Sequence, residues 1–434
     1  MKNTARSAAL QALLRCEKNG AWSGAVIDSA LREQALESRD AALAARLCLG
    51  VLQNDRYLDY HIDRLCRDSL EPRVRSILRL GAYQLLFLDK VPDHAAVSET
   101  VQLCRSVGLD RAAGLVNAVL RRLASEKDKL PPIPGEGTAA YLSTRWSHPL
   151  WLAEKLIAER GYAFAEDFFG ANNEPAPLCI QVNRLRVSPE DYIRALERSE
   201  IPYRDFPELP GCLELPGGKV TELPGFEEGL FYVQDRAARY AAEAAEVKPG
   251  MRVLDACAAP GGKSFAAAIA AGGDCELLAC DIHEKKLRLI ESGAKRLGIG
   301  CIRTRCMDAR TFEPEFKGAF DRVLADVPCS GLGVIRKRPE IRRKSEAEIG
   351  ALPEIQAAIL NNLARTVKPG GLLLYSTCTV LREENREQIR RFLETHPDFQ
   401  IEGCPYFAEG LYEFWPQKDG TDGFFAARLR RIKA

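Results

Sequence analysis

From about residue 236 to the C-terminus, short apolar runs alternate with helical stretches, and turn residues separate them. This repeat is typical of a parallel sheet, because two parallel neighbours must be joined by a connection, usually a helix, that crosses over the sheet. We therefore predict an α/β domain over residues 236–434. Its predicted strands span 252–256, 276–281, 302–305, 320–326 and 371–376, with a closing pair near 399–402 and 424–429.

Two regions of different character precede this domain. Apolar residues recur at three- and four-residue spacing over 4–127, as in Leu43, Leu47 and Val51, which predicts an all-helical domain over 1–128. Residues 129–140 are rich in Pro and Gly and are predicted to be a linker. Residues 141–235 alternate helical stretches with short strands such as 178–182, which predicts a small α+β domain.

Composition limits the partners and the compartment. Lys and Arg number 61 against 60 Asp and Glu, so nucleic acid would have to meet local basic patches. No apolar run approaches the ~18 residues of a membrane helix, and the first residues lack the apolar stretch of a signal peptide. We therefore expect a cytoplasmic monomer that contacts no membrane. The 14 cysteines include no CxxC pair, so we expect neither a disulfide framework nor a bound metal.

The strongest local motif runs from Val253 to Ser264, where a buried strand enters a Gly-rich turn that opens an Ala-rich helix. Ligands of open parallel sheets bind at such turns, beyond the carboxyl ends of the strands. Gly residues let the backbone approach a ligand closely, and the helix start offers free N–H donors. The predicted cofactor-binding turn consists of Cys257, Ala258, Ala259, Pro260, Gly261, Gly262 and Lys263.

A phosphate-binding loop of an NTPase is the competing interpretation of this turn. That motif needs Gly-x4-Gly-Lys-Ser/Thr, and Gly262-Lys263-Ser264 fit its second half. The first Gly position is Cys257, which departs from the motif. The apolar run that ends in Asp326 could serve as the magnesium-binding strand, so this alternative stays open.

Two further carboxylates follow successive predicted strands. Asp281 lies about twenty residues after the glycines, where an acidic residue can accept the hydroxyls of a ribose, but it could equally cap the helix that follows. Asp308 follows the third strand and is either a turn residue or an acceptor for an adenine amine. Together with the Gly-rich turn, these positions favour an adenosine-bearing ligand.

Two cysteines come directly after buried strands. Cys329 follows the strand that ends in Asp326, and Cys378 follows the strand that ends near Ser376. Most cysteines are inert core residues. Two of them at the sheet edge beside a ligand turn instead favour a catalytic role, because that edge is where a thiolate meets a substrate.

These motifs resemble those of the RNA 5-methylcytosine methyltransferases of the Sun/Fmu type, the RsmB/NOP family. The helical region resembles a NusB-like RNA-binding domain in two segments, 93–99 and 114–120. The resemblance implies a Rossmann-like class I methyltransferase domain behind a NusB-like domain and a small α+β domain. It also implies S-adenosyl-L-methionine as cofactor and 16S ribosomal RNA as substrate, with transfer RNA or another ribosomal RNA as the alternative.

The resemblance assigns Cys378 as the nucleophile and Cys329 as a helper in product release. Chemistry alone does not separate them, because DNA cytosine methyltransferases use the Pro-Cys position that Cys329 occupies here. Asp326 is implied to hydrogen-bond the cytosine near N3 and also to border the cofactor site. Lys263 is expected to lie between the cofactor turn and the base, and to pair with Asp326.

The basic residues at 336–338 and 342–344 directly follow the Cys329 loop. A solvated helix face is the ordinary interpretation of such a run, but its place beside the catalytic edge favours contacts with RNA phosphates. Asn183, Arg184, Gln234 and Asp235 are expected to have RNA-binding or structural roles. A ribosome-assembly factor without catalytic activity is the remaining alternative function.

Overall fold

The computed structural model describes residues 4–19, 24–34 and 36–432. The chain forms two compact units, one of residues 1–174 with 335–346 and the other of residues 175–334 with 347–434. The chain therefore leaves the second unit after residue 334 and returns to it at residue 347.

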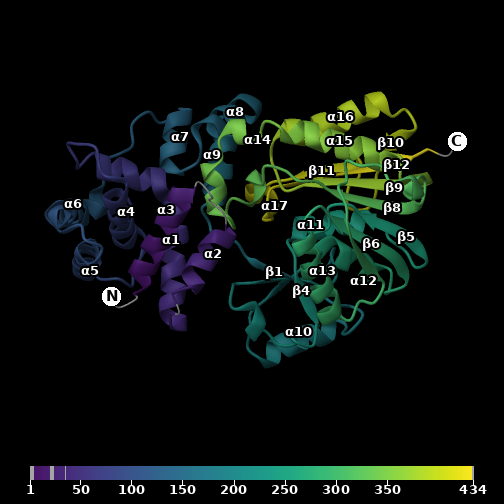
Figure 1. Ribbon diagram of the computed structural model, residues 1–434, viewed down its shortest axis with the longest axis horizontal. Coiled ribbons are helices and arrows are strands. Elements are labelled where there is room, and N and C mark those ends of the chain that lie inside the picture. The colour runs from purple at the N-terminus through teal and green to yellow at the C-terminus, as the bar shows by residue number, and fades with distance from the viewer. Residues whose placement is uncertain (1–3, 20–23, 35, 433–434) are drawn as a thin grey trace. The chain divides into compact units, whose positions relative to one another are not determined.

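The first unit is built from helices (Figure 1). Leu, Ala, Val and Ile side chains of α1, α3, α4, α5 and α6 interlock in one core, as the three- and four-residue spacing predicts. The all-helical prediction for 4–127 is thereby confirmed over the described residues. The helices are α1 (Ala5–Asn19), α2 (Gly24–Arg32), α3 (Ser38–Asp63), α4 (Pro72–Phe87), α5 (Asp93–Ser106), α6 (Ala113–Glu126), α7 (Ala139–Arg145), α8 (Leu150–Arg160) and α9 (Tyr162–Ala171).

A later part of the chain completes this unit. Residues 335–346 contain a short 3-10 helix, Pro339–Arg343, which packs against α3. The three helices α7 to α9, which the prediction for 141–235 grouped with the following strands, are compact with the helical unit.

The second unit begins with a four-stranded antiparallel sheet in the order β2-β3-β1-β4. One helix, α10 (Pro189–Arg198), packs its buried Tyr192 and Leu196 against the strand residues Ile180 and Phe231. This arrangement confirms the α+β prediction. The strands are β1 (Leu178–Val182), β2 (Arg204–Asp205), β3 (Cys212–Leu215) and β4 (Phe231–Val233).

The larger sheet of this unit has the order β10-β12-β9-β8-β5-β6-β7, and β11 pairs with β12. The five strands from β9 to β7 are parallel, whereas β12 is antiparallel to β9. All predicted strands are present, and β11 is an addition. The strands are β5 (Met251–Asp255), β6 (Cys275–Asp281), β7 (Ile302–Cys306), β8 (Phe320–Asp326), β9 (Val367–Thr377), β10 (Phe399–Ile401), β11 (Leu411–Phe414) and β12 (Phe424–Arg431).

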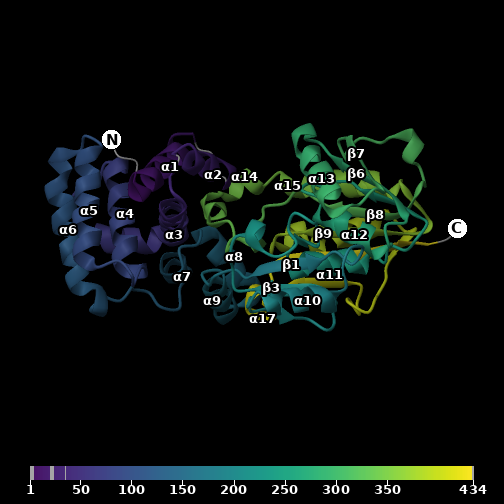
Figure 2. The same cartoon turned by 90° about the horizontal axis from the view of Figure 1, so that it is seen from below.

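Helices cover both faces of this sheet (Figures 1 and 2). On one face α11 (Arg236–Ala244), α12 (Gly262–Ala270) and α13 (Glu284–Leu297) bury Ala, Leu and Ile side chains against the strands. On the other face lie α15 (Leu352–Ala364) and α16 (Arg386–Thr395). Two short helices, α14 (Glu346–Ile349) and α17 (Pro416–Asp419), complete the α-helices of the described residues. No described helix is long and apolar enough to cross a membrane.

The strand order also locates the site. The first strand of the sheet, β5, lies between β6 and β8, so the chain runs outward from β5 in both directions. Open α/β sheets bind their ligands at this reversal, beyond the carboxyl ends of the strands. The carboxyl ends of β5, β6, β8 and β9 therefore form the edge of the sheet where a ligand is expected to bind.

Candidate active site

The predicted cofactor turn connects β5 to α12. Gly261 has φ +112°, a left-handed conformation that L side chains rarely adopt, and an added Cβ there would lie 2.6 Å from Cζ of Phe265. A Cβ on Gly262 would lie 3.2 Å from Nε2 of Gln234. The Ala258 amide donates to the carbonyl of Cys280 at 2.7 Å, which ties the turn to β6. Both glycines are therefore needed where the turn is tightest.

A buried carboxylate that the sequence analysis did not single out supports this turn. Asp255, at the end of β5, is fully buried and accepts a hydrogen bond from Ser264 Oγ at 2.6 Å. Burial raises the pKa of Asp255 to about 7. Asp255 thus stabilises the first turn of α12. The sequence gave no sign of this role, because the residues on either side of Asp255 are apolar.

Lys263 and Asp326 form the ion pair that the sequence analysis predicted. Lys263 Nζ lies 2.6 Å from Asp326 Oδ2, and the Lys263 side chain is only 7% exposed. Ser376 Oγ donates to the other carboxylate oxygen of Asp326 at 2.8 Å. Lys263 Nζ also lies 4.9 Å from the centre of the Phe424 ring. The pair therefore joins the cofactor turn to the ends of β8 and β9.

The two motif cysteines lie side by side. Cys329 Sγ and Cys378 Sγ are 3.3 Å apart, and both residues are partly exposed. The hydrogen bond with Cys329 lowers the pKa of the Cys378 thiol, and the charge of Lys263 acts in the same direction. Burial and the charges of Asp326 and Asp422 oppose this lowering of the pKa. The same hydrogen bond, burial and the charges of Glu384 and Asp326 raise the pKa of Cys329 well above its ordinary value. Either thiol can donate the hydrogen bond between them, and the pKa of Cys378 is the lower of the two when Cys329 donates.

Glu384 braces both cysteine loops, and the sequence analysis missed it. One carboxylate oxygen of Glu384 accepts from the Ser330 amide at 2.9 Å and the other from Thr379 Oγ1 at 3.2 Å. These two partners directly follow Cys329 and Cys378. Glu384 is buried although it lies in a charged run, where nothing in the sequence distinguishes it from solvated neighbours. The two loops are thus held together from behind the thiols.

The two remaining predicted cofactor carboxylates differ in their surroundings. Asp281 ends β6, is 8% exposed, and accepts from the His283 amide at 2.9 Å, so it caps the turn before α13. Asp308 accepts hydrogen bonds from the side chain of Arg310, including one from Nη2 at 2.6 Å. An adenine amine would have to share Asp308 with Arg310. Their assignment to ribose and adenine stays a prediction.

Comparison with known proteins places this site in a family. The family description 16S rRNA methyltransferase RsmB/F matches residues 242–430, NusB matches 3–125, and a ferredoxin-like domain of RsmF/B-like methyltransferases matches 148–221. The chain is 34% identical to the probable ribosomal RNA small subunit methyltransferase B of Bacillus subtilis, with 99% of each chain covered. The chain belongs to the RsmB/F methyltransferase family.

Two further comparisons agree with this membership. Ribosomal RNA small subunit methyltransferase B of Cronobacter sakazakii is 33% identical to the chain, with 98% of each chain covered. The crystal structure of PH0851 superposes with a TM-score of 0.80 at 27% identity, and the match covers 98% of this chain and 99% of that one. As a member of the RsmB/F family the chain is a methyltransferase with a NusB-like domain, a ferredoxin-like domain and a Rossmann-like catalytic domain.

The cofactor of this RsmB/F methyltransferase is S-adenosyl-L-methionine. The residues present fit it, because Gly261 has a backbone conformation that other residues rarely adopt, a Cβ on Gly262 would be in tight contact with Gln234, and the start of α12 lies there. Carboxylates suit the positive charge of the methionine part and the hydroxyls of the ribose. Asp281, Asp308 and Asp326 at the ends of successive strands would supply them.

One residue of the basic stretch, Arg342, does not do what the sequence analysis favoured. Arg342 is 2% exposed and donates to the backbone carbonyls of Gln53 and Trp146, each at 2.7 Å. It also donates to the carbonyls of Ser147 and Asn172 and to Oδ1 of Asn173. Its prediction as a phosphate contact was therefore wrong: the side chain satisfies carbonyl groups inside the first unit.

Arg343 is also engaged inside the first unit. It pairs with the buried Asp55 at 2.6 Å. Burial lowers the pKa of Arg342 to about 9, which leaves it charged at neutral pH. A charge run beside a catalytic loop can thus be an internal anchor, because the chain path, which sequence does not reveal, carries it into another unit.

The polar residues that border the middle domain are structural by their contacts. Asn183 is fully buried and donates to the carbonyls of Gly229 and Leu297 at 2.9 and 2.8 Å. Asp235 caps α11 by accepting from the Ala237 amide at 2.9 Å. Among the alternatives left open for these positions, the contacts favour the structural one.

Proposed function

We propose that this chain transfers a methyl group from S-adenosyl-L-methionine to carbon 5 of a cytosine in 16S ribosomal RNA through a covalent adduct with Cys378. The observation that carries the proposal is the 3.3 Å contact of Cys378 with Cys329 beside the Lys263–Asp326 pair. The ribosomal substrate follows the names of the relatives, which are small-subunit ribosomal RNA methyltransferases.

Carbon 5 of cytosine is too weak a nucleophile to accept a methyl group directly. When the Cys378 thiolate forms a bond to C6, the electrons of the C5–C6 double bond move to C5, which then bonds the methyl group that the bound cofactor supplies. A base removes the proton of C5, the double bond re-forms, and the Sγ–C6 bond breaks. Covalent catalysis of this kind replaces one difficult step by several easier ones.

The electron shift to C5 needs a partner on the cytosine ring. Asp326 lies at the end of β8, on the same sheet edge as Cys378, and would hydrogen-bond the ring near N3 as the adduct forms. Lys263 neutralises Asp326 and, through its charge, favours the thiolate of Cys378. Cys329 would assist the release of the product.

The choice of Cys378 over Cys329 has support beyond family resemblance. The two thiols share a hydrogen bond, and the positive charge of Lys263 acts on Cys378. The charge of Asp326 opposes ionisation of both thiols, and the charge of Glu384 opposes ionisation of Cys329. A nucleophile must be a thiolate, so the charge of Lys263, which acts on Cys378, supports Cys378 for attack.

The NTPase alternative has less support. A phosphate-binding loop needs a lysine directed at the phosphates, and Lys263 is paired with Asp326 at 2.6 Å. Cys257 also stands where the first glycine of that loop is required. Calorimetry with ATP and with S-adenosyl-L-methionine separates the two functions.

RNA contacts remote from the reacting base would come from the NusB-like domain. A hollow of about 820 Å³ between α5 and α6 is lined by Arg105, Arg121, His94 and Gln102 among others. Arg121 is exposed and is held by Asn117 Oδ1 at 3.1 Å. With a global charge near zero, such local groups are the ones that can meet phosphates.

Methyl transfer to 16S ribosomal RNA from a strain that lacks the gene tests the proposal. With tritiated cofactor the wild type should label this RNA, and bisulfite sequencing should show one newly protected cytosine. Cys378→Ala should label nothing and should still bind the cofactor. Labelling of transfer RNA alone would correct the substrate, and full labelling by Cys378→Ala would refute the covalent mechanism.

A further inference from the structure

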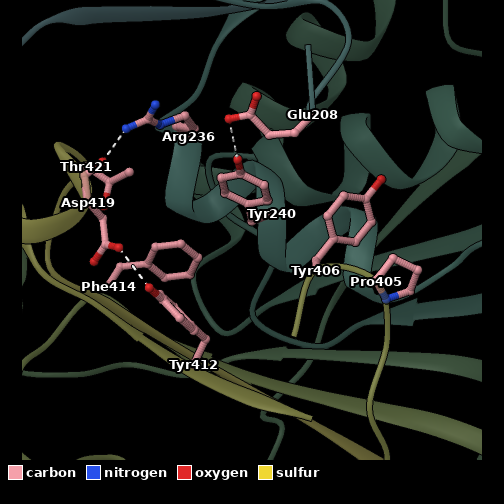
Figure 3. Close-up of a pocket in the computed structure, with 9 residues that line it drawn as sticks. All are labelled: Glu208, Arg236, Tyr240, Pro405, Tyr406, Tyr412, Phe414, Asp419 and Thr421. Atoms are coloured by element: carbon pink, nitrogen blue, oxygen red, sulfur yellow. Dashed lines mark hydrogen bonds between the residues drawn. The ribbon is translucent and has the colours of Figure 1, made fainter. Parts of the chain in front are cut away.

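An aromatic cavity opens on the second unit, outside the cofactor turn and the cysteine pair. Its volume is about 590 Å³, within the range of roughly 300–1,000 Å³ that ligand pockets occupy. Figure 3 shows the rings of Tyr240, Tyr406, Tyr412 and Phe414 around it. These residues come from α11, from the loop before β11, and from β11 itself.

The rings form a platform for a flat ligand. Tyr240 and Phe414 are stacked with ring centres 5.7 Å apart and planes 19° apart. Tyr406 stands 5.9 Å from Tyr240 with planes at 60°, so it closes the platform at an angle. Tyr240, Tyr406 and Tyr412 are only partly buried, which leaves ring surface open. Nucleobases bind on such surfaces by stacking.

The wall of the cavity carries more negative than positive charge, which disfavours a phosphate. Arg236 is the guanidinium of the cavity, and it is engaged: it donates to the Asp419 carbonyl and lies 4.0 Å from the centre of the Phe206 ring. Glu208 and Asp419 add two negative charges. A phosphate would be repelled by these carboxylates, whereas a neutral base would not.

One carboxylate is placed to read the edge of a base. Asp419 is used internally, because its two oxygens accept from Tyr412 Oη at 2.8 Å and from the Trp415 amide at 2.7 Å. Glu208 is exposed and accepts from Tyr240 Oη at 3.1 Å, which leaves lone pairs on its carboxylate. An exocyclic amino group is the natural donor to it, so adenine, cytosine or guanine fits better than uracil.

The cavity borders the catalytic edge through consecutive residues. Thr421 lines the cavity, and the next residue, Asp422, is close enough for its charge to act on Cys378. The Gly423 amide then donates to the carbonyl of Gly333, in the loop that follows Cys329, at 2.8 Å. Adjacent Cα atoms are about 3.8 Å apart, so one wall of the cavity begins next to a residue whose charge acts on Cys378.

The opposite wall of the cavity lies close along the chain to a residue that contacts the cofactor turn. Arg236 lines the cavity, and Gln234, two residues earlier, faces Gly262. Asp235, between them, accepts a hydrogen bond from the Asp422 amide at 3.3 Å. Each wall thus contains a residue that lies one or two positions along the chain from a residue of the catalytic edge.

We propose that this cavity binds a second base of the RNA strand, an amino-bearing base that flanks the target cytosine and stacks on Tyr240 and Tyr406 while Glu208 accepts its amino group. The inference rests on the proposed RNA methyltransferase function. It adds a sequence-reading subsite to the site of chemistry, and it gives the ferredoxin-like domain, which supplies Glu208, a direct part in substrate choice.

The test uses the full chain and a synthetic RNA centred on the cytosine that bisulfite sequencing identifies. The fluorescent base 2-aminopurine, which carries an exocyclic amino group and is quenched by stacking, replaces each nucleotide from two before to two after the target in turn. One position should be quenched on binding to the wild type. Tyr406→Ala should restore its fluorescence and weaken RNA binding about 5- to 100-fold, whereas Tyr406→Phe should behave as the wild type.

A second variant tests the reading of the base. Glu208→Ala should reduce the preference for an amino-bearing base over uracil at that one position, without changing the affinity for S-adenosyl-L-methionine. Unfolding temperatures equal to that of the wild type exclude a folding defect in either variant. If no position depends on Tyr406 while the wild type methylates the same RNA, the subsite is refuted and the proposed function stands. If the wild type methylates no RNA, the proposed function itself fails.

Discussion

The loop that follows β8 consists of two parts with different roles. Residues 326–334 remain in the catalytic unit and carry Asp326 and Cys329, whereas residues 335–346 join the helical unit and carry Arg342. Sequence reasoning placed the first part correctly, because a residue at the end of a parallel strand has a position that the fold dictates. It misjudged Arg342 in the second part, because a run of positive charge has the same appearance whether it faces RNA or anchors a loop.

Replacement of Arg342, which anchors the loop in the helical unit, should have the largest effect on stability. Arg342→Ala leaves several buried carbonyl groups and Asn173 without their donor, and we expect a loss of about 3–5 kcal/mol in the stability of the helical unit. Hydrogen exchange on the full chain should show faster exchange in α3 and α7 to α9. The affinity for S-adenosyl-L-methionine should not change.

Arg338 is the matched control in the same stretch, because it is exposed. Arg338→Ala should leave hydrogen exchange in the helical unit as in the wild type. If Arg342→Ala also left it unchanged and instead weakened RNA binding at low salt, the phosphate interpretation of the stretch would be restored.

This anchor also changes how the NusB-like domain can be tested. Removal of residues 1–127 would take away Gln53 and Asp55, the partners of Arg342 and Arg343, and leave both arginines without them. A loss of activity would then report a disturbed loop as well as lost RNA contacts. Point variants on the surface of α6 separate the two.

The carboxylates that follow strands of the catalytic unit are predicted to affect cofactor binding. Asp281→Ala should weaken the binding of S-adenosyl-L-methionine by roughly 1.5–3 kcal/mol if the carboxylate holds the ribose through charge-assisted hydrogen bonds. Asp308→Ala should cost less, because Arg310 already shares that carboxylate. An unchanged affinity in Asp281→Ala, measured by calorimetry, would leave Asp281 only its role in the turn before α13.

The ion pair at the end of β8 predicts a shift in the pH profile. The pKa of Cys378 is lowered by the hydrogen bond from Cys329 and further by the charge of Lys263, so the thiolate persists to lower pH than for an ordinary thiol. Lys263→Met removes that charge and should move the acidic limb of kcat/KM to higher pH. A limb that stayed in place or moved to lower pH would show that Lys263 does not favour the thiolate.

The smallest effect is expected on the surface of the NusB-like domain. Arg121→Ala should reduce the salt slope of RNA binding by roughly 0.7 if it contacts one phosphate of a single strand. Arg122, which pairs with Glu126, is the neighbouring control. Equal slopes for the wild type and Arg121→Ala across a salt series would remove Arg121 from the RNA-binding surface.

Much of the fold and part of the site could be predicted because periodicity reports which face of an element is buried. The strands from β5 to β9 follow from that rule. The positions of Asp326, Cys329 and Cys378 follow from their place at strand ends, and that of Lys263 from the Gly-rich turn. Glu384 could not be found, because its role depends on a loop that folds back behind both cysteines. The short strand β11 was missed because its residues, Leu411–Phe414, show too few alternations to be distinguished from a loop.

The central claim is that Cys378 attacks the cytosine and Cys329 releases the product, and trapping of the RNA adduct tests it most directly. Each variant is incubated with 16S ribosomal RNA and S-adenosyl-L-methionine, denatured, and run on a gel that separates free protein from protein bound to RNA. Cys329→Ala should accumulate a covalent adduct, because the bond to C6 forms but breaks slowly, and Cys378→Ala should form none. An adduct with Cys378→Ala and none with Cys329→Ala would contradict the account and exchange the two roles.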